Sequence, residues 1–357
     1  MKVKIIGAGS IGNHLAQASR RMGWDVVVID KDSEALRRMK EDIYPTRYGS
    51  WDESIQLFTS DKEPMGDFDI ICIGTPPDTH IALALKALEE NPKLLQIEKP
   101  LCTPFLEGLD EFLAKLKNQP ETKVIVGYDN VLLPSVQFVA KLLTGSEKID
   151  IGEILTIDVE FREHWAGIFK AHPWLGGPND SYLGFWRRGG GASGEHSHAL
   201  HMWQYFANLL ADSFGRLKRF SATMDMVEKN DFEYDAITLF NLKTESGRVG
   251  RVVQDVITSP TKKWARIQGE KGFIEWIGNG HSKGDVVKWE TELGQSSKIF
   301  KKTRPDDFFC EIKHMQGILD GDISAEHSSV SIQSGIDVMT VLKLAHTHRN
   351  KGMVDIN

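Results

Sequence analysis

A glycine run near the N-terminus constrains the fold of this chain more than any other feature. Residues 3–6 have the apolar character of a short buried strand, the run Gly7-Ala8-Gly9-Ser10-Ile11-Gly12 follows at once, and the apolar spacing of residues 13–22 is helical. A strand, a tight turn and a helix in this order begin a dinucleotide-binding unit, in which the start of the helix offers N–H groups to a pyrophosphate. We therefore expect cofactor contacts at Gly7, Gly9, Ser10, Ile11 and Gly12.

An acidic residue follows the second expected strand, residues 24–29. Asp30 stands near the position where a carboxylate accepts hydrogen bonds from the ribose hydroxyls of the adenosine. The same charge repels the 2′-phosphate of NADP, so the sequence favours NAD, while Lys31 beside it leaves use of both cofactors as an alternative. A glycine turn that binds no nucleotide is the other alternative.

Two later strands end in residues suited to the nicotinamide end of a cofactor. Residues 69–74 form an apolar strand followed by Thr75-Pro76-Pro77, with Asp78 as the expected N-cap of a helix through Ile81, Leu85 and Leu88. Residues 94–97 form the next strand and deliver Glu98-Lys99-Pro100 to the same sheet edge, where ligands bind in open α/β folds. We expect cofactor contacts at Thr75, Pro76, His80, Glu98 and Lys99. A stiff turn and a solvated lysine are the alternatives.

Length and composition limit the remaining possibilities. A chain of 357 residues is long enough for two domains, which we place at 1–127 and 128–357. The net charge of −7 and the lack of a long apolar run argue against nucleic acid and membrane partners, which leaves a small molecule. Three dispersed cysteines suggest a reducing compartment, and the strand at residue 3 leaves no room for a signal peptide, so we expect a cytoplasmic protein.

The second half reads as strands separated by turns, which predicts a largely antiparallel, open sheet with one covered face. Ile237, Leu239 and Leu242 are expected to point the same way. A loop rich in aromatic residues and glycine, residues 164–191, precedes one helix over residues 193–210. The chain closes with helices expected over residues 308–319 and 328–348, the last of which can pack back on the first domain.

Together these motifs resemble the Gfo/Idh/MocA family of sugar and cyclitol dehydrogenases over essentially the whole chain. The resemblance rests on the glycine run, Thr75-Pro76-Pro77, Glu98-Lys99-Pro100, three glycines before a histidine-bearing helix, and the closing helices. It implies a Rossmann domain followed by an α/β domain with a large, mostly antiparallel, open-faced sheet, with homodimers or homotetramers formed through that sheet. It also implies that Lys99 touches both substrate and nicotinamide and that Lys99-Pro100 is a candidate cis peptide.

The chemistry of alcohol oxidation explains why a lysine and a histidine are expected in the active site. The hydroxyl proton must pass to a base as the hydride leaves, and an ammonium beside the oxygen stabilises alkoxide character. His198 aligns best with the helix histidine of the family, although the acid that the family commonly has one turn earlier is Gly194 here. Glu195 and His201 lie three residues on either side of His198, and which of Glu195, His196, His198 and His201 moves the proton stays open.

Other residues of the second half are candidate substrate contacts. We expect Tyr128, Trp165, Arg187, Glu195, His198 and His201 to meet the substrate, because aromatic faces stack on sugar rings and arginines meet acidic groups. A zinc site at Glu195, His198 and His201 is a distant alternative, since no HExxH spacing or cysteine partner supports it, and we assign no metal. The sequence thus predicts an NAD-dependent dehydrogenase acting on CH–OH groups, with a non-catalytic NAD(H)-binding sensor of the same fold as the alternative.

Overall fold

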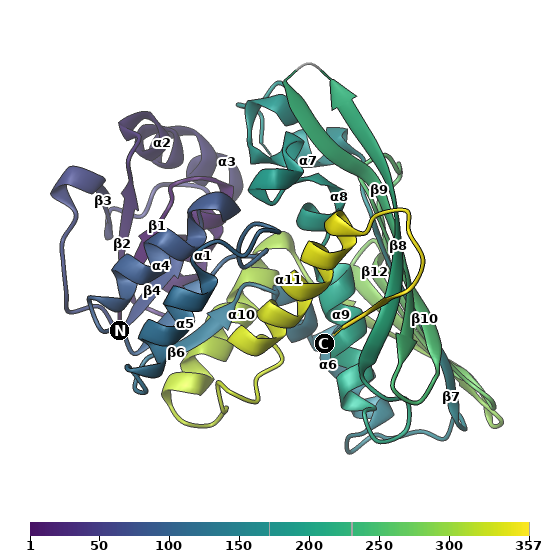
Figure 1. The fold of residues 1–357 in the computed structure, drawn as a ribbon. Coiled ribbons are helices and arrows are strands. Elements are labelled where there is room, and N and C mark those ends of the chain that lie inside the picture. The colour runs from purple at the N-terminus through teal and green to yellow at the C-terminus, as the bar shows by residue number, and fades with distance from the viewer. Residues whose placement is uncertain (171, 230, 357) are drawn as a thin grey trace. The chain divides into compact units, whose positions relative to one another are not determined.

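The computed structural model describes residues 1–356 apart from residues 171 and 230 (Figure 1). The chain forms two compact units. The first contains Met1–Asp129 and Arg304–Ile336, and the second contains Asn130–Thr303 and Asp337–Asn357. The segment that begins at Arg304 therefore belongs with the N-terminal part of the chain, although the sequence had given residues 128–357 to one domain.

The first unit is built on a six-stranded parallel sheet in the order β3-β2-β1-β4-β5-β6. This is the strand order of a doubly wound dinucleotide-binding fold, so the predicted Rossmann architecture is confirmed. The strands are β1 Lys2–Ile6, β2 Asp25–Asp30, β3 Ile55–Thr59, β4 Ile70–Ile73, β5 Leu94–Ile97 and β6 Lys123–Val126. The helices are α1 Ser10–Arg21, α2 Ser33–Arg38, α3 Tyr44–Tyr48, α4 His80–Leu88, α5 Leu109–Lys117 and α10 Arg304–Leu319, with short helical turns at Met39–Ile43, Ser60–Lys62 and Pro77–Thr79.

The expected N-cap of α4 is wrong. Asp78 is not the N-cap of α4, because it lies inside the 3₁₀ turn Pro77–Thr79, and Thr79 precedes the helix without a side-chain cap.

Helix α10 packs along α1: the His14 ring stacks on Phe308 with centroids 4.4 Å apart, and the Arg21 guanidinium lies 3.8 Å from the centre of the Phe309 ring. The first unit therefore holds a helix from the far end of the sequence.

The second unit is built on a nine-stranded sheet in the order β14-β13-β12-β11-β7-β10-β9-β8-β15. All neighbours pair antiparallel except β7 and β10, which are parallel, so the predicted open, mostly antiparallel sheet is confirmed. The strands are β7 Ile154–Arg162, β8 Leu217–Lys229, β9 Phe232–Thr244, β10 Val249–Asp255, β11 Lys262–Gly269, β12 Phe273–His281, β13 Gly284–Thr291, β14 Gly294–Lys301 and β15 Val354–Asp355. The helices are α6 Pro134–Leu143, α7 Trp165–Lys170, α8 Gly191–Glu195 and α9 His198–Leu209, with short turns at Asp129–Leu132, Pro178–Asp180, Tyr182–Gly184 and Trp186–Arg188, while α11 Ile332–Thr347 spans the unit boundary.

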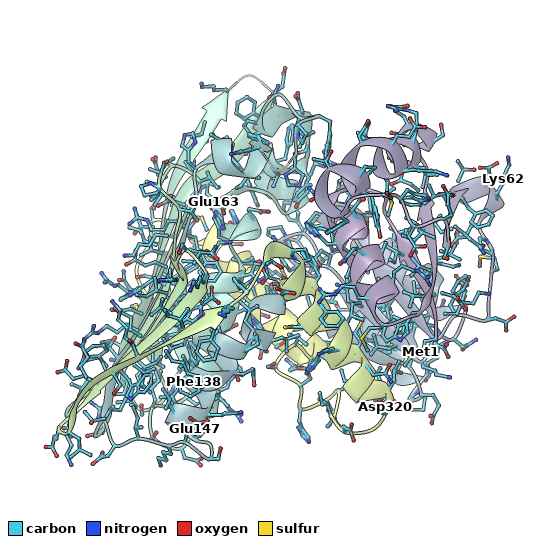
Figure 2. The ribbon with its side chains drawn as sticks, turned by 180° about the vertical axis from the view of Figure 1, so that it is seen from behind. Met1, Lys62, Phe138, Glu147, Glu163 and Asp320 are labelled. Carbon is cyan, nitrogen blue, oxygen red and sulfur yellow. The ribbon has the colours of Figure 1, made fainter. Side chains whose placement is uncertain are left out.

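Helices cover one face of this sheet, with α6 and α9 lying against it (Figure 1). The Phe138 side chain of α6 packs on Trp289 and Phe300 of β13 and β14, with ring centroids 5.6 and 5.3 Å apart (Figure 2). The expectation that Leu239 and Leu242 share a face is wrong: Leu242 is buried, and Leu239 is 39% exposed. Side chains alternate along a strand, so positions 239 and 242 cannot point the same way.

Candidate functional site

The turn between β1 and α1 has the shape that a dinucleotide requires. A Cβ on Gly12 would lie 1.9 Å from the carbonyl oxygen of Gly7, whereas a Cβ on Gly9 would meet nothing within 4 Å. Gly9 is also the N-cap of α1, it makes no side-chain cap, and the first turn holds no acidic residue. Backbone packing at Gly12 and open space at Gly9 leave the start of α1 suited to an anion, so these residues fit a cofactor pyrophosphate.

Asp30 closes this turn from the end of β2. Its Oδ2 accepts a hydrogen bond from the Ala8 backbone N–H at 2.8 Å, and its Oδ1 accepts one from the Asp32 N–H at 2.9 Å. The carboxylate is therefore fixed beside the turn, and Lys31 next to it is exposed.

Arg47 of α3 reaches the same turn, a contact that the sequence alone did not predict. Its guanidinium donates to the Ser10 hydroxyl at 2.9 Å and to the Ser10 carbonyl at 3.1 Å. The Ser10 hydroxyl accepts from Arg47, so its own proton is available to an acceptor elsewhere. Arg47 thus adds positive charge at the N-terminus of α1. The contact was not predicted from the sequence because Arg47 and Ser10 are 37 positions apart.

His80 joins the two strand-end loops. Its ring is fully buried, with Nε2 2.7 Å from the Thr75 carbonyl oxygen and Nδ1 3.0 Å from the Pro100 carbonyl oxygen. Burial lowers the pKa of His80, and the backbone contacts act against that shift. Both ring nitrogens face protein carbonyls, and a neutral ring donates to one of them while the protonated ring donates to both. The ring thus lies between the Thr75 and Pro100 loops.

Lys99 is the second residue after β5 and stands between two buried neighbours, Glu98 and Pro100. The Lys99–Pro100 peptide is cis, which confirms that expectation. The Glu98 side chain is 6% exposed and accepts a hydrogen bond from the Gln96 side chain at 3.2 Å. Burial raises the pKa of Glu98 to about 8, while the Lys99 ammonium lowers it. The Glu98 carboxyl therefore points into the unit, whereas Lys99 is half-buried.

The single helix expected over residues 193–210 is wrong, because it is interrupted. Helix α8 ends at Glu195, and α9 begins at His198. The His196 carbonyl, which lies in the interruption, accepts a hydrogen bond from the Gln254 side chain of β10. Glu195 and His198 consequently belong to different helices and do not form the continuous stripe that helical spacing suggested.

His198 lies at the first turn of α9 and is held by a residue from outside its helix. Its Nδ1 is 3.3 Å from Nδ2 of Asn130, and its ring lies over Phe161 with centroids 6.3 Å apart. His198 and Glu195 are partly exposed, whereas His196 and His201 are 4% and 2% exposed. Of His196, His198 and His201, His198 is therefore the accessible one, and the Asn130 side chain lies beside its ring.

A buried polar network anchors α8. Asp235 of β9 accepts hydrogen bonds from the Ser193 N–H at 2.6 Å, the Ser193 hydroxyl at 3.0 Å and the Thr238 hydroxyl at 2.6 Å. The Ser193 hydroxyl also lies 3.1 Å from Nε2 of His346. Burial raises the pKa of Asp235 to about 6 and lowers that of His346 to about 3. This network fixes the segment that leads to His198.

The remaining expected substrate contacts differ in access. Tyr128 is fully buried, and Trp165 is 8% exposed in an apolar cluster where it packs on Phe169 and Tyr234. Arg187 is 61% exposed, lies 3.6 Å from Glu233 and covers the Trp186 ring. The structure thus places Tyr128 and Trp165 in packing positions and leaves Arg187 at the surface.

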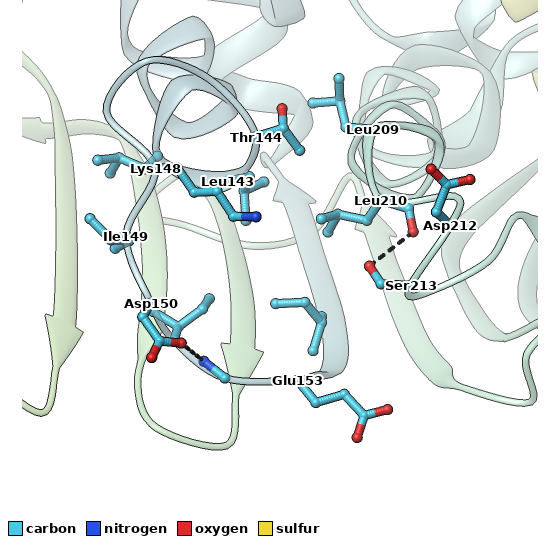
Figure 3. A pocket seen from close by; sticks show the side chains of 14 residues that line it. Leu143, Thr144, Lys148, Ile149, Asp150, Glu153, Leu209, Leu210, Asp212 and Ser213 are labelled. Atoms are coloured by element: carbon cyan, nitrogen blue, oxygen red, sulfur yellow. Dashed lines mark hydrogen bonds between the residues drawn. The ribbon is translucent and has the colours of Figure 1, made fainter.

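A cavity of about 680 Å³ lies in the second unit between the end of α6, the start of β7 and the end of α9 (Figure 3). It is lined by residues such as Leu143, Ile149 and Leu210, and none of the predicted site residues lines it. Across residues 1–356 without 171 and 230, no group of three or more His, Cys, Asp or Glu side chains could hold a metal ion. In the same part of the chain, no helix combines the length and apolarity that crossing a membrane requires.

Comparisons with known proteins agree with this geometry. Residues 1–128 match the Gfo/Idh/MocA model described as an oxidoreductase family with an NAD-binding Rossmann fold. No curated protein sequence matches the chain.

Three solved structures illustrate the similarity of fold. An oxidoreductase from Agrobacterium radiobacter, in complex with NAD⁺, L-tartaric acid and magnesium, has a TM-score of 0.75 at 17% identity over 99% of this chain and 98% of that chain. Levoglucosan dehydrogenase, in complex with NADH and levoglucosan, has a TM-score of 0.75 at 17% identity over 100% of this chain and 99% of that chain. The WlbA dehydrogenase from Bordetella pertussis, in complex with NADH and UDP-GlcNAcA, has a TM-score of 0.72 at 18% identity over 100% of this chain and 98% of that chain. Residues 1–128 are thus an NAD-binding Rossmann domain of the Gfo/Idh/MocA oxidoreductase family, as the sequence resemblance predicted, and the whole chain has the fold of these oxidoreductases.

Proposed function

We propose that this protein is an NAD-dependent dehydrogenase that transfers a hydride between nicotinamide and a secondary alcohol or ketone of a sugar, a sugar derivative or a cyclitol. The observation that carries the proposal is Lys99, the second residue after β5 of an NAD-binding Rossmann domain. Ligands of open α/β sheets bind at the carboxyl ends of the strands, which is where this lysine stands. Structures of similar fold contain levoglucosan or UDP-GlcNAcA beside NADH, which supports the substrate class.

Each proposed role follows from chemistry that a side chain can perform. When bound, the nicotinamide ring supplies the hydride acceptor or donor. The Lys99 ammonium stabilises negative charge on the substrate oxygen, and Nε2 of His198 takes or delivers the hydroxyl proton. Glu195 and Arg187 remain proposed substrate contacts, because both are accessible.

The cofactor contacts proposed for the first unit centre on the glycine turn. The backbone of Gly9, Ser10 and Ile11 receives the pyrophosphate, and Asp30 receives the adenosine ribose. Arg47 joins this set through its hydrogen bonds to Ser10. His80 acts as a positioning residue, since its ring spans Thr75 and Pro100.

The decisive experiment screens polyols, aldoses and nucleotide sugars for NAD reduction by the wild type and by Lys99→Met. Loss of a transition-state charge contact lowers kcat by about 10²–10³-fold, and NADH binding, followed by fluorescence, should persist. Lys93→Met is the matched control, because Lys93 precedes β5 at its opposite end and pairs with Asp69. Equal activity of the wild type and Lys99→Met would remove Lys99 from the proposed role. NADH binding by a wild type that turns over no polyol would favour the sensor.

A homodimer or homotetramer is also part of this proposal. On the sheet of the second unit, Leu155 of β7, Val249 of β10 and Leu239 of β9 are 38%, 57% and 39% exposed, and these three strands are neighbours in the sheet. Light scattering of the wild type and of Leu239→Glu tests the assembly, and an unchanged mass for the variant argues against this face.

A further inference from the structure

Two buried carboxyl groups share the side-chain amide of Gln96. The side chain of Gln96 in β5 donates to Oε2 of Glu98 at 3.2 Å and to Oε1 of Glu311 in α10 at 3.1 Å. Gln96, Glu98 and Glu311 are 0%, 6% and 1% exposed. The Gln96 amide has two N–H bonds, so this arrangement uses both of them.

The backbone of Gly127 packs closely against this cluster. A Cβ on Gly127, at the end of β6, would lie 2.2 Å from Oε2 of Glu98 and 2.8 Å from Nε2 of Gln96. The Glu98 carboxyl also accepts a hydrogen bond from the backbone N–H of Lys99. A chain of hydrogen bonds therefore runs from α10 through β5 to the peptide that bears the lysine.

The geometry indicates which carboxyl keeps its proton. Oε2 of Glu311 has no hydrogen-bond partner among the described residues. A buried carboxylate oxygen without a donor is costly, whereas a protonated one is not charged. Burial raises the pKa of Glu311 well above its usual range, and the nearby carboxyls of Glu98 and Asp129 raise it further. The Lys99 ammonium lowers the pKa of Glu98, so Glu98 loses its proton first.

We propose that Glu311 is a positioning residue for the reaction: as a neutral carboxylic acid it fixes Gln96, and through Gln96 and Glu98 it fixes the backbone of Lys99. The proposal rests on the role proposed for Lys99. Under this proposal Glu311 acts from helix α10, which lies outside residues 1–128. It acts by accepting a hydrogen bond and carries no charge.

Charge and hydrogen bonding can be separated by two substitutions. Glu311→Gln keeps an oxygen that accepts from Gln96, so kcat should equal that of the wild type. Glu311→Leu removes the acceptor at similar volume, so kcat should fall by about 10- to 100-fold, as expected when a catalytic group is misplaced by about 1 Å. The Kd of NADH should stay unchanged in both variants. Gln96→Leu should reproduce the loss, and combining it with Glu311→Leu should add little, because both changes break one chain of hydrogen bonds.

Infrared spectroscopy at neutral pH gives a readout that needs no activity. The wild-type spectrum minus that of Glu311→Gln should contain the carbonyl band of a protonated carboxylic acid. A carboxylate band in its place would overturn the proposal, and so would wild-type kcat in both Glu311→Leu and Gln96→Leu. A wild type that binds NADH, shows the acid band and oxidises no substrate would refute the proposed function, and with it the positioning role, but not the neutral state of Glu311.

Discussion

Nδ2 of Asn130 lies 3.3 Å from Nδ1 of His198, which joins the segment after the Rossmann domain to the first turn of α9. The amide can present either end to the ring, because its nitrogen and oxygen exchange places by a half-turn. With the amide oxygen accepting from Nδ1–H, Nε2 of the neutral ring takes a proton from an alcohol. In the reverse direction the imidazolium, still held through Nδ1–H, delivers the Nε2 proton to a ketone and returns to the neutral ring. One residue can thus support both directions of the proposed reaction.

Asn130→Leu should lower kcat by about 10- to 100-fold, since it removes the group that orients the imidazole. Asn130→Asp should keep the contact but add a negative charge, which favours the protonated imidazole and moves the acidic limb of kcat/KM to higher pH. Steady-state kinetics across a pH series measures both effects. A profile that is the same in all three proteins would exclude Asn130 as the partner that matters.

Asp30→Asn should raise the ratio of kcat/KM for NADP over NAD by about 10-fold or more, because hydrogen bonds to charged groups contribute about 1.5–3 kcal/mol. Asparagine retains an oxygen for the Ala8 N–H, so the glycine turn should keep its shape. Asp30→Ala loses both the charge and this contact, and it should also weaken NADH binding. An unchanged cofactor ratio in both variants would show that Asp30 does not set the preference.

Arg47→Met should raise the Kd of NADH by about 10- to 100-fold, through the loss of charge-assisted contacts near the pyrophosphate. Competition should weaken for ADP-ribose and stay the same for adenosine, which has no phosphate. Arg37→Met is the control: Arg37 is exposed on α2, pairs with Glu34 and Glu41, and carries the same charge. Equal losses in the two variants would point to general electrostatics in place of a contact.

Secondary-structure elements whose bounds depend on neighbouring residues could be predicted from the sequence. Strand β5 has the predicted bounds, because the apolar run that ends just before Glu98 is a local feature of the sequence. Strand β14 carries no comparable local signal, because most of its side chains are exposed. The interruption before α9 was missed because it depends on Gln254, 58 positions away from His196.

The candidate site divides in the same way. Motifs predicted the glycine turn, Asp30 and Lys99, because each of them is read within one strand and the loop after it. The residues that contact His198 and Gln96 come from distant parts of the sequence: Asn130 is 68 positions from His198, and Glu311 is 215 positions from Gln96. Only the fold brings such pairs together, and a single sequence holds no signal for their distances.

The Asp235 network gives a prediction about stability and pH. Burial raises the folded-state pKa of Asp235 from 3.8 to about 6, so the folded form binds this proton more tightly than the unfolded form. This tighter proton binding adds to the free energy of unfolding at acidic pH, and the addition is lost as pH rises through about 6. The loss amounts to about 2 kcal/mol between about pH 4.5 and about pH 7. Asp235→Asn lacks this loss, so its free energy of unfolding should rise relative to the wild type by about that amount over the same interval.

Urea denaturation at several pH values measures this difference, and the hydrogen bond lost in Asp235→Asn adds the same offset at each pH. His346→Gln provides the opposite control. Burial lowers the pKa of His346 to about 3, so its stabilising contribution grows as pH rises toward 6.5. The variant should therefore lose stability relative to the wild type over the interval where Asp235→Asn gains it. Two differences with the same slope would show that Asp235 and His346 do not titrate as this buried network requires.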